Sequence, residues 1–192
     1  MHSQGLGIAA EMEILGYCLD EQLTGEAHCS RAAGKAMRTA GAIGRSSKFL
    51  PESDREFLVA TLVCPHLAYC QNSMYSPSKA ASDYMERAYN RAARMICRME
   101  RTGPALDKLG WPTWLEGWRR KQMQFVEKIF RTGQPKVLKE RFSDPLDGAM
   151  ATRAIRRGEL WEPPSGSGMN QKSFSIWAPR VYNEYLRGKC AK

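Results

Sequence analysis

Residues 85–101, with the sequence MERAYNRAARMICRMER, contain the clearest helical pattern in the chain. Ser76-Pro77 upstream fits an N-cap followed by proline at the first helical position, and Gly103-Pro104 downstream would stop a helix. The sequence therefore predicts a helix from Ser76 to Arg101. Its apolar side chains recur every three or four positions, which is typical of a buried helix face; they are Met85, Ala88, Tyr89, Ala92, Met95, Ile96 and Met99.

Arginines occupy the opposite face of this predicted helix. Like charges in a stripe repel one another, so the arrangement costs stability unless carboxylates or phosphates face it. The planar guanidinium group is well shaped to bind phosphate. We therefore expect this face to contact a sugar–phosphate backbone without reading bases. The alternatives are a solvated face, or one that pairs with acidic residues of a missing neighbouring domain. The stripe, spaced by 4, 3, 4 and 3 residues, consists of Arg87, Arg91, Arg94, Arg98 and Arg101.

The distribution of charge points to the same kind of partner. The 192 residues have a formal net charge of +9, with six Lys and Arg against eight Asp and Glu in residues 1–75 and 23 against 12 in residues 76–192. A basic back half is typical of proteins that bind nucleic acid or another polyanion, although surface Lys and Arg also serve solubility alone. Further candidates for nucleic-acid contact are Arg119, Arg120 and Lys121.

Other segments predict a mainly α-helical fold with a short β segment near the N-terminus and a loop-rich C-terminal part. Residues 13–20 form a short β-like run, and an Ala-rich helix is expected over 26–43. Capping-box spacings at Ser53/Glu56 and Thr113/Glu116 predict two helix starts, and Pro65 must kink or end the first of these helices. The second helix is expected to bury Leu115, Trp118, Phe125, Val126 and Ile129, and to end near 133–135. The aromatic segment 174–186 is expected to fold back onto the helical body.

The residues for autonomous catalysis are not evident. The sequence has no phosphate-binding loop motif, no nucleophile elbow, no HExxH and no adjacent aspartates. Cys64, His66 and Cys70 lie close together, but their spacing matches no standard zinc site. We therefore expect no enzyme activity, cofactor, metal or small-molecule substrate for this chain alone. Trp118 is expected in the core, and Trp111 and Trp114 are expected to pack as anchors, with base stacking as the alternative.

Six segments resemble, in order, blocks of the reverse transcriptases of non-LTR (LINE-type) retrotransposons, in the region that follows the polymerase palm. Tyr182 stands where the usual residue is tryptophan, and the closing proline of the last block is absent. The segments are LGYCLD at 15–20, the helix around His28-Cys29, LVCPHLAY at 62–69, MERAYNRAAR at 85–94, LGWPTWLE at 109–116 with Arg119-Arg120, and Ser173-Phe174-Ser175 with Val181-Tyr182-Asn183 and Leu186.

The resemblance implies a particular role for each part. Residues 1–24 would be a remnant of the palm and primer-grip strand, with Leu15 and Gly16 in the primer-grip position. Residues 25–133 would form a helical thumb-like domain, and residues 134–192 a loop-rich basic extension. The chain would bind template–primer RNA or DNA beside the missing palm and fingers, while the parent polymerase would hold Mg²⁺ at palm aspartates that this chain lacks.

Two alternatives to a polymerase fragment remain open. The chain could be a standalone basic helical protein that binds RNA or DNA nonspecifically, or an inactive scaffold remnant whose arginines once paired with the palm. No apolar run approaches the roughly 18 residues that span a bilayer, so we expect no membrane partner. We expect an intracellular protein of the nucleus or the cytoplasm.

Overall fold

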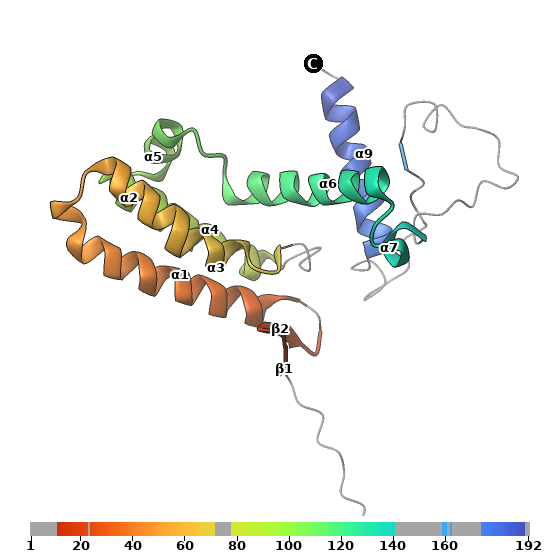
Figure 1. Ribbon diagram of the computed structural model, residues 1–192, viewed down its shortest axis with the longest axis horizontal. Helices are drawn as coiled ribbons and strands as arrows, with labels where there is room; N and C mark the ends of the chain where they lie inside the picture. The colour runs from red at the N-terminus through yellow and green to blue at the C-terminus, as the bar shows by residue number, and fades with distance from the viewer. Residues whose placement is uncertain are drawn as a thin grey trace, which may run out of the picture. The chain divides into compact units, whose positions relative to one another are not determined.

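The computed structural model describes residues 11–22, 24–71, 78–140, 159–160, 162 and 174–190, and they are mainly helical (Figure 1). The chain divides into two compact units, which are described separately. The first unit comprises Met1–Gln71 and Pro77–Trp114, and the second comprises Asn72–Ser76 and Leu115–Lys192. None of the described helices is long and apolar enough to cross a membrane.

A two-stranded antiparallel hairpin, β1 (Glu11–Ile14) and β2 (Tyr17–Asp20), begins the first unit. The turn between the strands consists of Leu15 and Gly16, both with positive φ, at 50° and 81°. The predicted single β run over 13–20 was therefore wrong in its continuity, because these two residues form a tight reversal rather than extended strand. Tyr69 lies against this turn, with its hydroxyl oxygen 3.5 Å from the position of a Cβ at Gly16.

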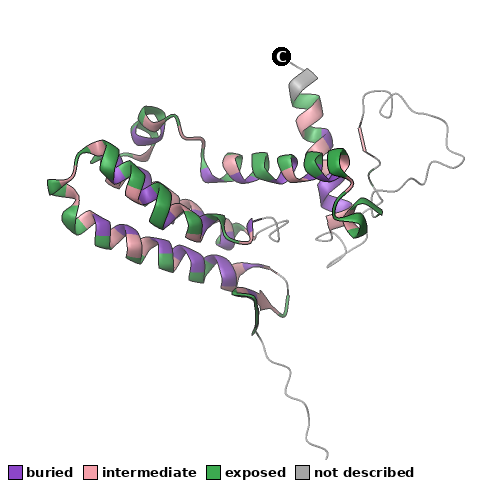
Figure 2. Ribbon diagram, in the orientation of Figure 1, coloured by how far each residue is buried: buried purple, intermediate pink, exposed green. Residues whose placement is uncertain are grey.

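The core of the first unit is formed by α1 (Glu26–Ser46) and α4 (Lys79–Cys97), which pack against each other. The two helices run parallel, since Ser78 Oγ donates to Glu26 at the N-terminal ends and the Arg98 guanidinium donates to the Ser47 carbonyl at the C-terminal ends. Their buried faces consist largely of small side chains, which allow a close approach (Figure 2). These are Ala32, Ala33, Ala36 and Ala40 on α1, and Ala81, Ala88, Ala92 and Ala93 on α4.

A segment of short helices leads the chain from the C-terminal end of α1 back towards the N-terminal end of α4, so that these two helices can run parallel. It comprises the 3₁₀ turn η1 (Ser47–Phe49), α2 (Glu52–Leu58), the π-helical turn η2 (Val59–Val63) and α3 (Cys64–Ala68). Pro65 lies in the first turn of α3, where its missing N–H leaves no bond unmade. The helix was predicted to kink or end at Pro65; it does not end there, but changes from the π-helical turn η2 to the α-helix α3 at Cys64, directly before the proline. The predicted capping box is not confirmed, because α2 begins at Glu52 and the Ser53 hydroxyl contacts Asp54 instead.

The predicted helix over 76–101 is confirmed in its centre and wrong at its C-terminal end. Ser78 is the N-cap, and its hydroxyl accepts from the Ala81 N–H at 3.1 Å; residues 76 and 77 lie outside the described part. The helix ends at Cys97 because Arg98 adopts a left-handed conformation, with φ 53° and ψ 42°. Gly103 and Pro104 do not stop a helix but lie in the first turn of α5 (Thr102–Leu109).

The second unit contains α6 (Trp114–Thr132), α7 (Lys136–Glu140) and α9 (Phe174–Cys190). α6 begins directly after Thr113 and ends near the predicted site. The prediction that 174–186 folds back is confirmed, because Trp177 and Ala178 of α9 form a buried cluster with Val126 of α6. Trp118, Val126 and Ile129 are buried as predicted and Phe125 is half-buried, but Leu115 is exposed on the outer side of the helix.

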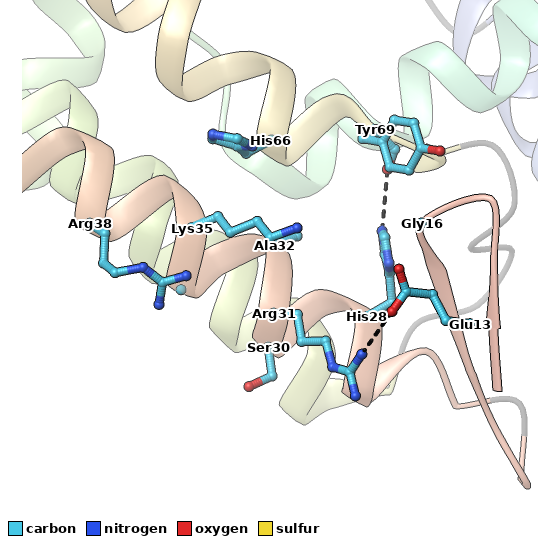
Figure 3. A pocket seen from close by; sticks show the side chains of 11 residues that line it. Glu13, Gly16, His28, Ser30, Arg31, Ala32, Lys35, Arg38, His66 and Tyr69 are labelled. Carbon is cyan, nitrogen blue, oxygen red and sulfur yellow. Dashed lines mark hydrogen bonds and ion pairs between the residues drawn. The ribbon is translucent and has the colours of Figure 1, made fainter. Parts of the chain in front are cut away.

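His28 links the hairpin, α1 and the end of α3. Its buried ring accepts from the Cys18 N–H through Nδ1 at 3.4 Å, and its Nε2 lies 3.5 Å from the Tyr69 carbonyl oxygen (Figure 3). The Tyr17 ring packs on it, with centroids 4.3 Å apart. Burial lowers the pKa of His28, and the charges of Lys35 and Arg31 act in the same direction against the hydrogen bond to Tyr69. The His28 ring is therefore uncharged in the folded protein at neutral pH.

We expect this histidine to make the first unit sensitive to mild acid. Because the pKa of His28 is lower in the folded state, the stability that it contributes is present above the unfolded pKa of about 6.5 and is lost as the pH falls below it. The slope is at most about 1.4 kcal/mol per pH unit. Chemical denaturation at pH 7 and pH 5 measures the loss, and a His28→Gln variant should lack this dependence. Equal pH dependence in both proteins would contradict the prediction.

Candidate nucleic-acid interface

A groove between the C-terminal halves of α1 and α4 gathers four of the arginines of the first unit. It encloses about 540 Å³, and its floor includes Ala40, Gly41 and Gly44 of α1. Arg91 Nη2 lies 4.0 Å from the position of a Cβ at Gly41, and Met95 Sδ lies 3.6 Å from one at Gly44. A Cβ at either position would thus make only ordinary van der Waals contact with α4. The charged residues that line it are Arg45, Arg91, Arg94, Arg98 and Glu100.

The four groove arginines differ in their hydrogen bonds to the rest of the protein. Arg94 donates to the Thr102 hydroxyl at 3.0 Å, and Arg98 donates to the Ser47 carbonyl. These two contacts fix the turn that follows α4, so both side chains have a structural role. Arg45 and Arg91 are exposed, and no hydrogen bond or ion pair is recorded for either within the described residues. Their charges are therefore available to a ligand.

Only part of the predicted stripe reaches this groove. Arg91, Arg94 and Arg98 line it, whereas Arg87 is turned back along α4, with Nε 3.0 Å from the Asp83 carbonyl oxygen and its guanidinium 5.0 Å from the Tyr84 ring centre. Arg101 lies beyond the helix, directly before α5, in an extended conformation. The prediction of five arginines on one helix face was wrong because α4 ends at Cys97. None of the five has a carboxylate partner among the described residues.

Arg45 was not among the predicted site residues. The predicted helix stopped at Ile43, but α1 continues to Ser46 and so includes Arg45. Its position was visible in the sequence: Arg31, Lys35, Arg38 and Arg45 follow one another at helical spacing on the same side of α1. Extending the helix by one turn would have found it.

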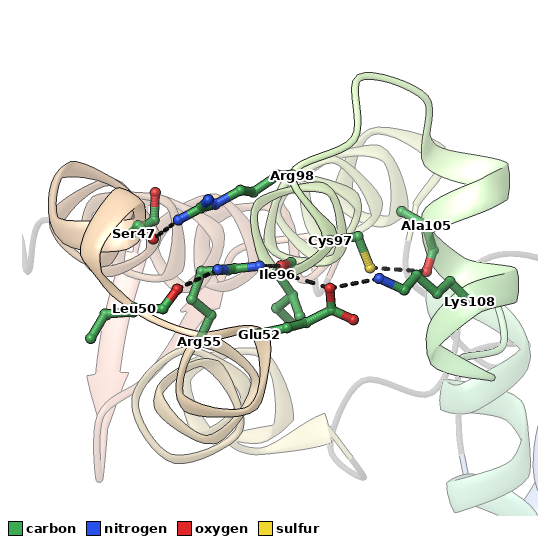
Figure 4. Close-up of polar contacts among 9 residues, drawn as sticks. All are labelled: Ser47, Leu50, Glu52, Arg55, Ile96, Cys97, Arg98, Ala105 and Lys108. Carbon is green, nitrogen blue, oxygen red and sulfur yellow. Dashed lines mark hydrogen bonds and ion pairs between the residues drawn. The ribbon is translucent and has the colours of Figure 1, made fainter.

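A buried arginine of α2 contacts the C-terminal end of α4. Arg55 of α2 is 4% exposed, and its Nε and Nη2 donate to the Ile96 carbonyl at 2.8 and 2.6 Å (Figure 4). Its Nη1 donates to the Leu50 carbonyl at 2.6 Å. The Ile96 carbonyl is one of the last four of α4, which have no partner inside the helix. Arg55 thus supplies hydrogen-bond donors to a carbonyl in the last turn of α4, the helix that Arg98 caps at its C-terminal end.

The remaining predicted cations lie elsewhere. Arg119, Arg120 and Lys121 are all exposed on α6, which runs through the second unit, and they have no ion pair within the described part of the chain. Leu15 and Gly16, predicted as primer-grip-like, form the hairpin turn, where Leu15 is 91% exposed and its carbonyl accepts from the Tyr69 hydroxyl. This turn presents an apolar side chain to solvent.

The described residues contain no group of three or more His, Cys, Asp or Glu side chains placed to hold a metal ion. Cys18, Cys29 and Cys97 are buried, and burial raises the pKa of Cys29 to about 12. A thiol in such an environment is protonated and unreactive near neutral pH. Trp114 and Trp118 are buried, and Trp111 packs against Tyr89 with centroids 5.2 Å apart and the ring planes tilted by 32°. These contacts confirm the expected packing of the three tryptophans.

Comparison with known proteins adds no relative. No protein-family model matches the sequence, and neither the curated proteins nor the solved structures contain a significant match.

Proposed function

We propose that the groove between α1 and α4 binds the phosphate backbone of RNA or DNA without reading its sequence. The observation that carries this proposal is the gathering of Arg45, Arg91, Arg94 and Arg98 around one open groove, where Glu100 is the acidic residue of the lining. Arginine binds phosphate through parallel N–H donors. A cationic groove between two helices can therefore bind a nucleic-acid backbone by electrostatic attraction to its phosphates, without contacts to the bases.

The resemblance described above gives this function a context. We propose that the chain corresponds to the thumb and downstream region of a non-LTR retrotransposon reverse transcriptase, with template–primer nucleic acid as the ligand. Polymerase chemistry and its Mg²⁺ would then belong to palm residues of the parent polypeptide, in the nucleus or the cytoplasm. Binding of a phosphate backbone in the groove does not depend on this assignment, because it requires only the charges of the groove arginines.

Removing the two groove arginines that have no internal contact tests the proposal cleanly. We expect Arg45→Gln with Arg91→Gln to weaken binding of a labelled RNA–DNA hybrid roughly tenfold at moderate salt, since each exposed charge contributes up to about 1 kcal/mol. Fluorescence anisotropy measures the affinity. The charge-matched control is Lys128→Gln with Arg131→Gln, two exposed cations of α6.

The two double variants lose the same net charge, so the comparison separates the groove from general electrostatic attraction. The control should bind within about twofold of the unsubstituted protein. Equal losses in both variants would show that charge alone, and not the groove, attracts the nucleic acid. Absence of binding by the unsubstituted protein would favour the interpretation of the chain as an inactive scaffold remnant.

A further inference from the structure

A second cavity of the first unit lies away from the groove, between the hairpin turn, α1 and α3 (Figure 3). It encloses about 560 Å³. The hairpin contributes Glu13 and Gly16, and Tyr69, which follows α3, lies over the same turn. The cavity is more enclosed than the arginine groove. Across it, α1 presents Lys35 and Arg38, and α3 presents His66.

Most of the negative charge at this cavity is already neutralised. Arg31 Nη2 lies 2.6 Å from Glu11, and its Nη1 lies 3.5 Å from Glu13. Lys35 and Arg38, by contrast, are exposed and have no carboxylate partner among the described residues. The cavity therefore carries two uncompensated positive charges, three residues apart on one face of α1.

Two further polar side chains complete the lining. The His66 imidazole and the Ser30 hydroxyl both border the cavity, and neither has a recorded hydrogen bond within the described part of the chain. Gly34 also lines the cavity, and Arg38 Nη1 is 3.6 Å from the position of a Cβ at Gly34. The guanidinium therefore lies close against the α1 backbone, at the edge of the cavity.

We propose that this cavity binds the terminal phosphate monoester of a nucleic-acid strand, a ligand that rests on the proposed backbone-binding function. A monoester carries a charge of nearly −2 and three strong acceptor oxygens near neutral pH. Lys35, Arg38 and His66 together offer an ammonium, a guanidinium fork and an imidazole N–H for them. An internal phosphodiester carries only one negative charge and two unesterified oxygens, so it would satisfy this cluster of donors less completely.

The experiment compares single-stranded oligonucleotides of one sequence that carry a phosphate at one end, at the other end, or at neither. We expect the unsubstituted protein to bind one phosphorylated form about fivefold to tenfold more tightly than the unphosphorylated form. Lys35→Gln with Arg38→Gln should abolish this preference and leave the affinity for the unphosphorylated strand within about twofold. Arg45→Gln with Arg91→Gln should weaken binding of all three strands and keep the preference.

Two results would overturn the proposal: no preference for either phosphorylated strand, or a preference that survives Lys35→Gln with Arg38→Gln. If no strand binds at all, the proposed backbone function fails, and inorganic phosphate tests the cavity by itself. Saturable changes in the NMR signals of the His66 ring on titration with inorganic phosphate, absent in the Lys35/Arg38 double variant, would support an anion site for free phosphate. Unchanged His66 signals would exclude the cavity as an anion site.

Discussion

An Arg55→Ala variant should lose about 3 kcal/mol of unfolding free energy, one of the two largest effects that we expect from a single substitution. The side chain is 4% exposed and donates to two carbonyls, that of Ile96 through both Nε and Nη2 and that of Leu50 through Nη1. Alanine would leave the buried Ile96 carbonyl and the partly buried Leu50 carbonyl without these donors and would open a cavity between α2 and the end of α4. Denaturant unfolding followed by circular dichroism measures the loss.

Two further variants separate this role from a simple loss of charge. Arg55→Lys keeps the charge but cannot reach both carbonyls as a fork, so we expect an intermediate loss. Arg45→Ala removes an exposed arginine of the same unit and should change stability by less than about 0.5 kcal/mol. If Arg55→Ala were no more destabilising than Arg45→Ala, Arg55 would not stabilise the end of α4.

An Asn183→Ala variant should destabilise the second unit by about 2–3 kcal/mol. Asn183 is 1% exposed, and its Oδ1 accepts from the Leu160 N–H at 2.7 Å. Its Nδ2 donates to the Leu160 carbonyl at 2.8 Å and to Glu162 at 2.9 Å. The side-chain amide thus makes the two hydrogen bonds to Leu160 that a neighbouring strand would otherwise make. Alanine would leave the N–H and the carbonyl of Leu160 without these bonds.

Hydrogen exchange localises this effect. Amides of α9 should exchange about 30- to 150-fold faster in the Asn183→Ala variant, which corresponds to the expected free energy, while amides of α1 should be unchanged. The neighbouring Glu184→Ala serves as the control, because Glu184 is exposed. Equal protection of α9 in the two variants would show that the Asn183 hydrogen bonds add nothing to the stability of this unit.

The regular parts of the fold were predictable from apolar periodicity. The spacing of Met85, Ala88, Ala92 and Ile96 placed the buried face of α4 correctly, and all four are at most 1% exposed. The start of α6 and the buried positions of Trp118 and Val126 were likewise predicted. Such positions depend on local spacing and on the hydrophobic effect, which the sequence shows directly.

The turns were not predictable, because they depend on tertiary contacts. Arg98 ends α4 in a left-handed conformation that glycine usually adopts, and its side-chain contact with Ser47 comes from 51 residues away. Leu15 similarly takes a positive φ in a turn where asparagine is the usual residue. No local signal distinguishes these residues from helical or extended ones.

Part of the candidate site was predictable from local spacing, and the rest depends on tertiary contacts. Sequence spacing found Arg91, Arg94 and Arg98, but the packing of α1 against α4 was needed to add Arg45 and to exclude Arg87 from the groove. Arg55 was also missed, because an arginine between Asp54 and Glu56 reads as a surface residue in the sequence. Its partners, the Ile96 and Leu50 carbonyls, become visible only in three dimensions.

The salt dependence of nucleic-acid binding tests the central claim most directly. For an RNA–DNA hybrid titrated between about 50 and 200 mM salt, four groove arginines predict that the logarithm of the association constant falls against the logarithm of salt concentration with a slope of about −3 to −4. Replacing Arg45 and Arg91 with glutamine should reduce this slope by about two. No binding at low salt, or the same slope in both proteins, would contradict the assignment of the groove as the nucleic-acid interface.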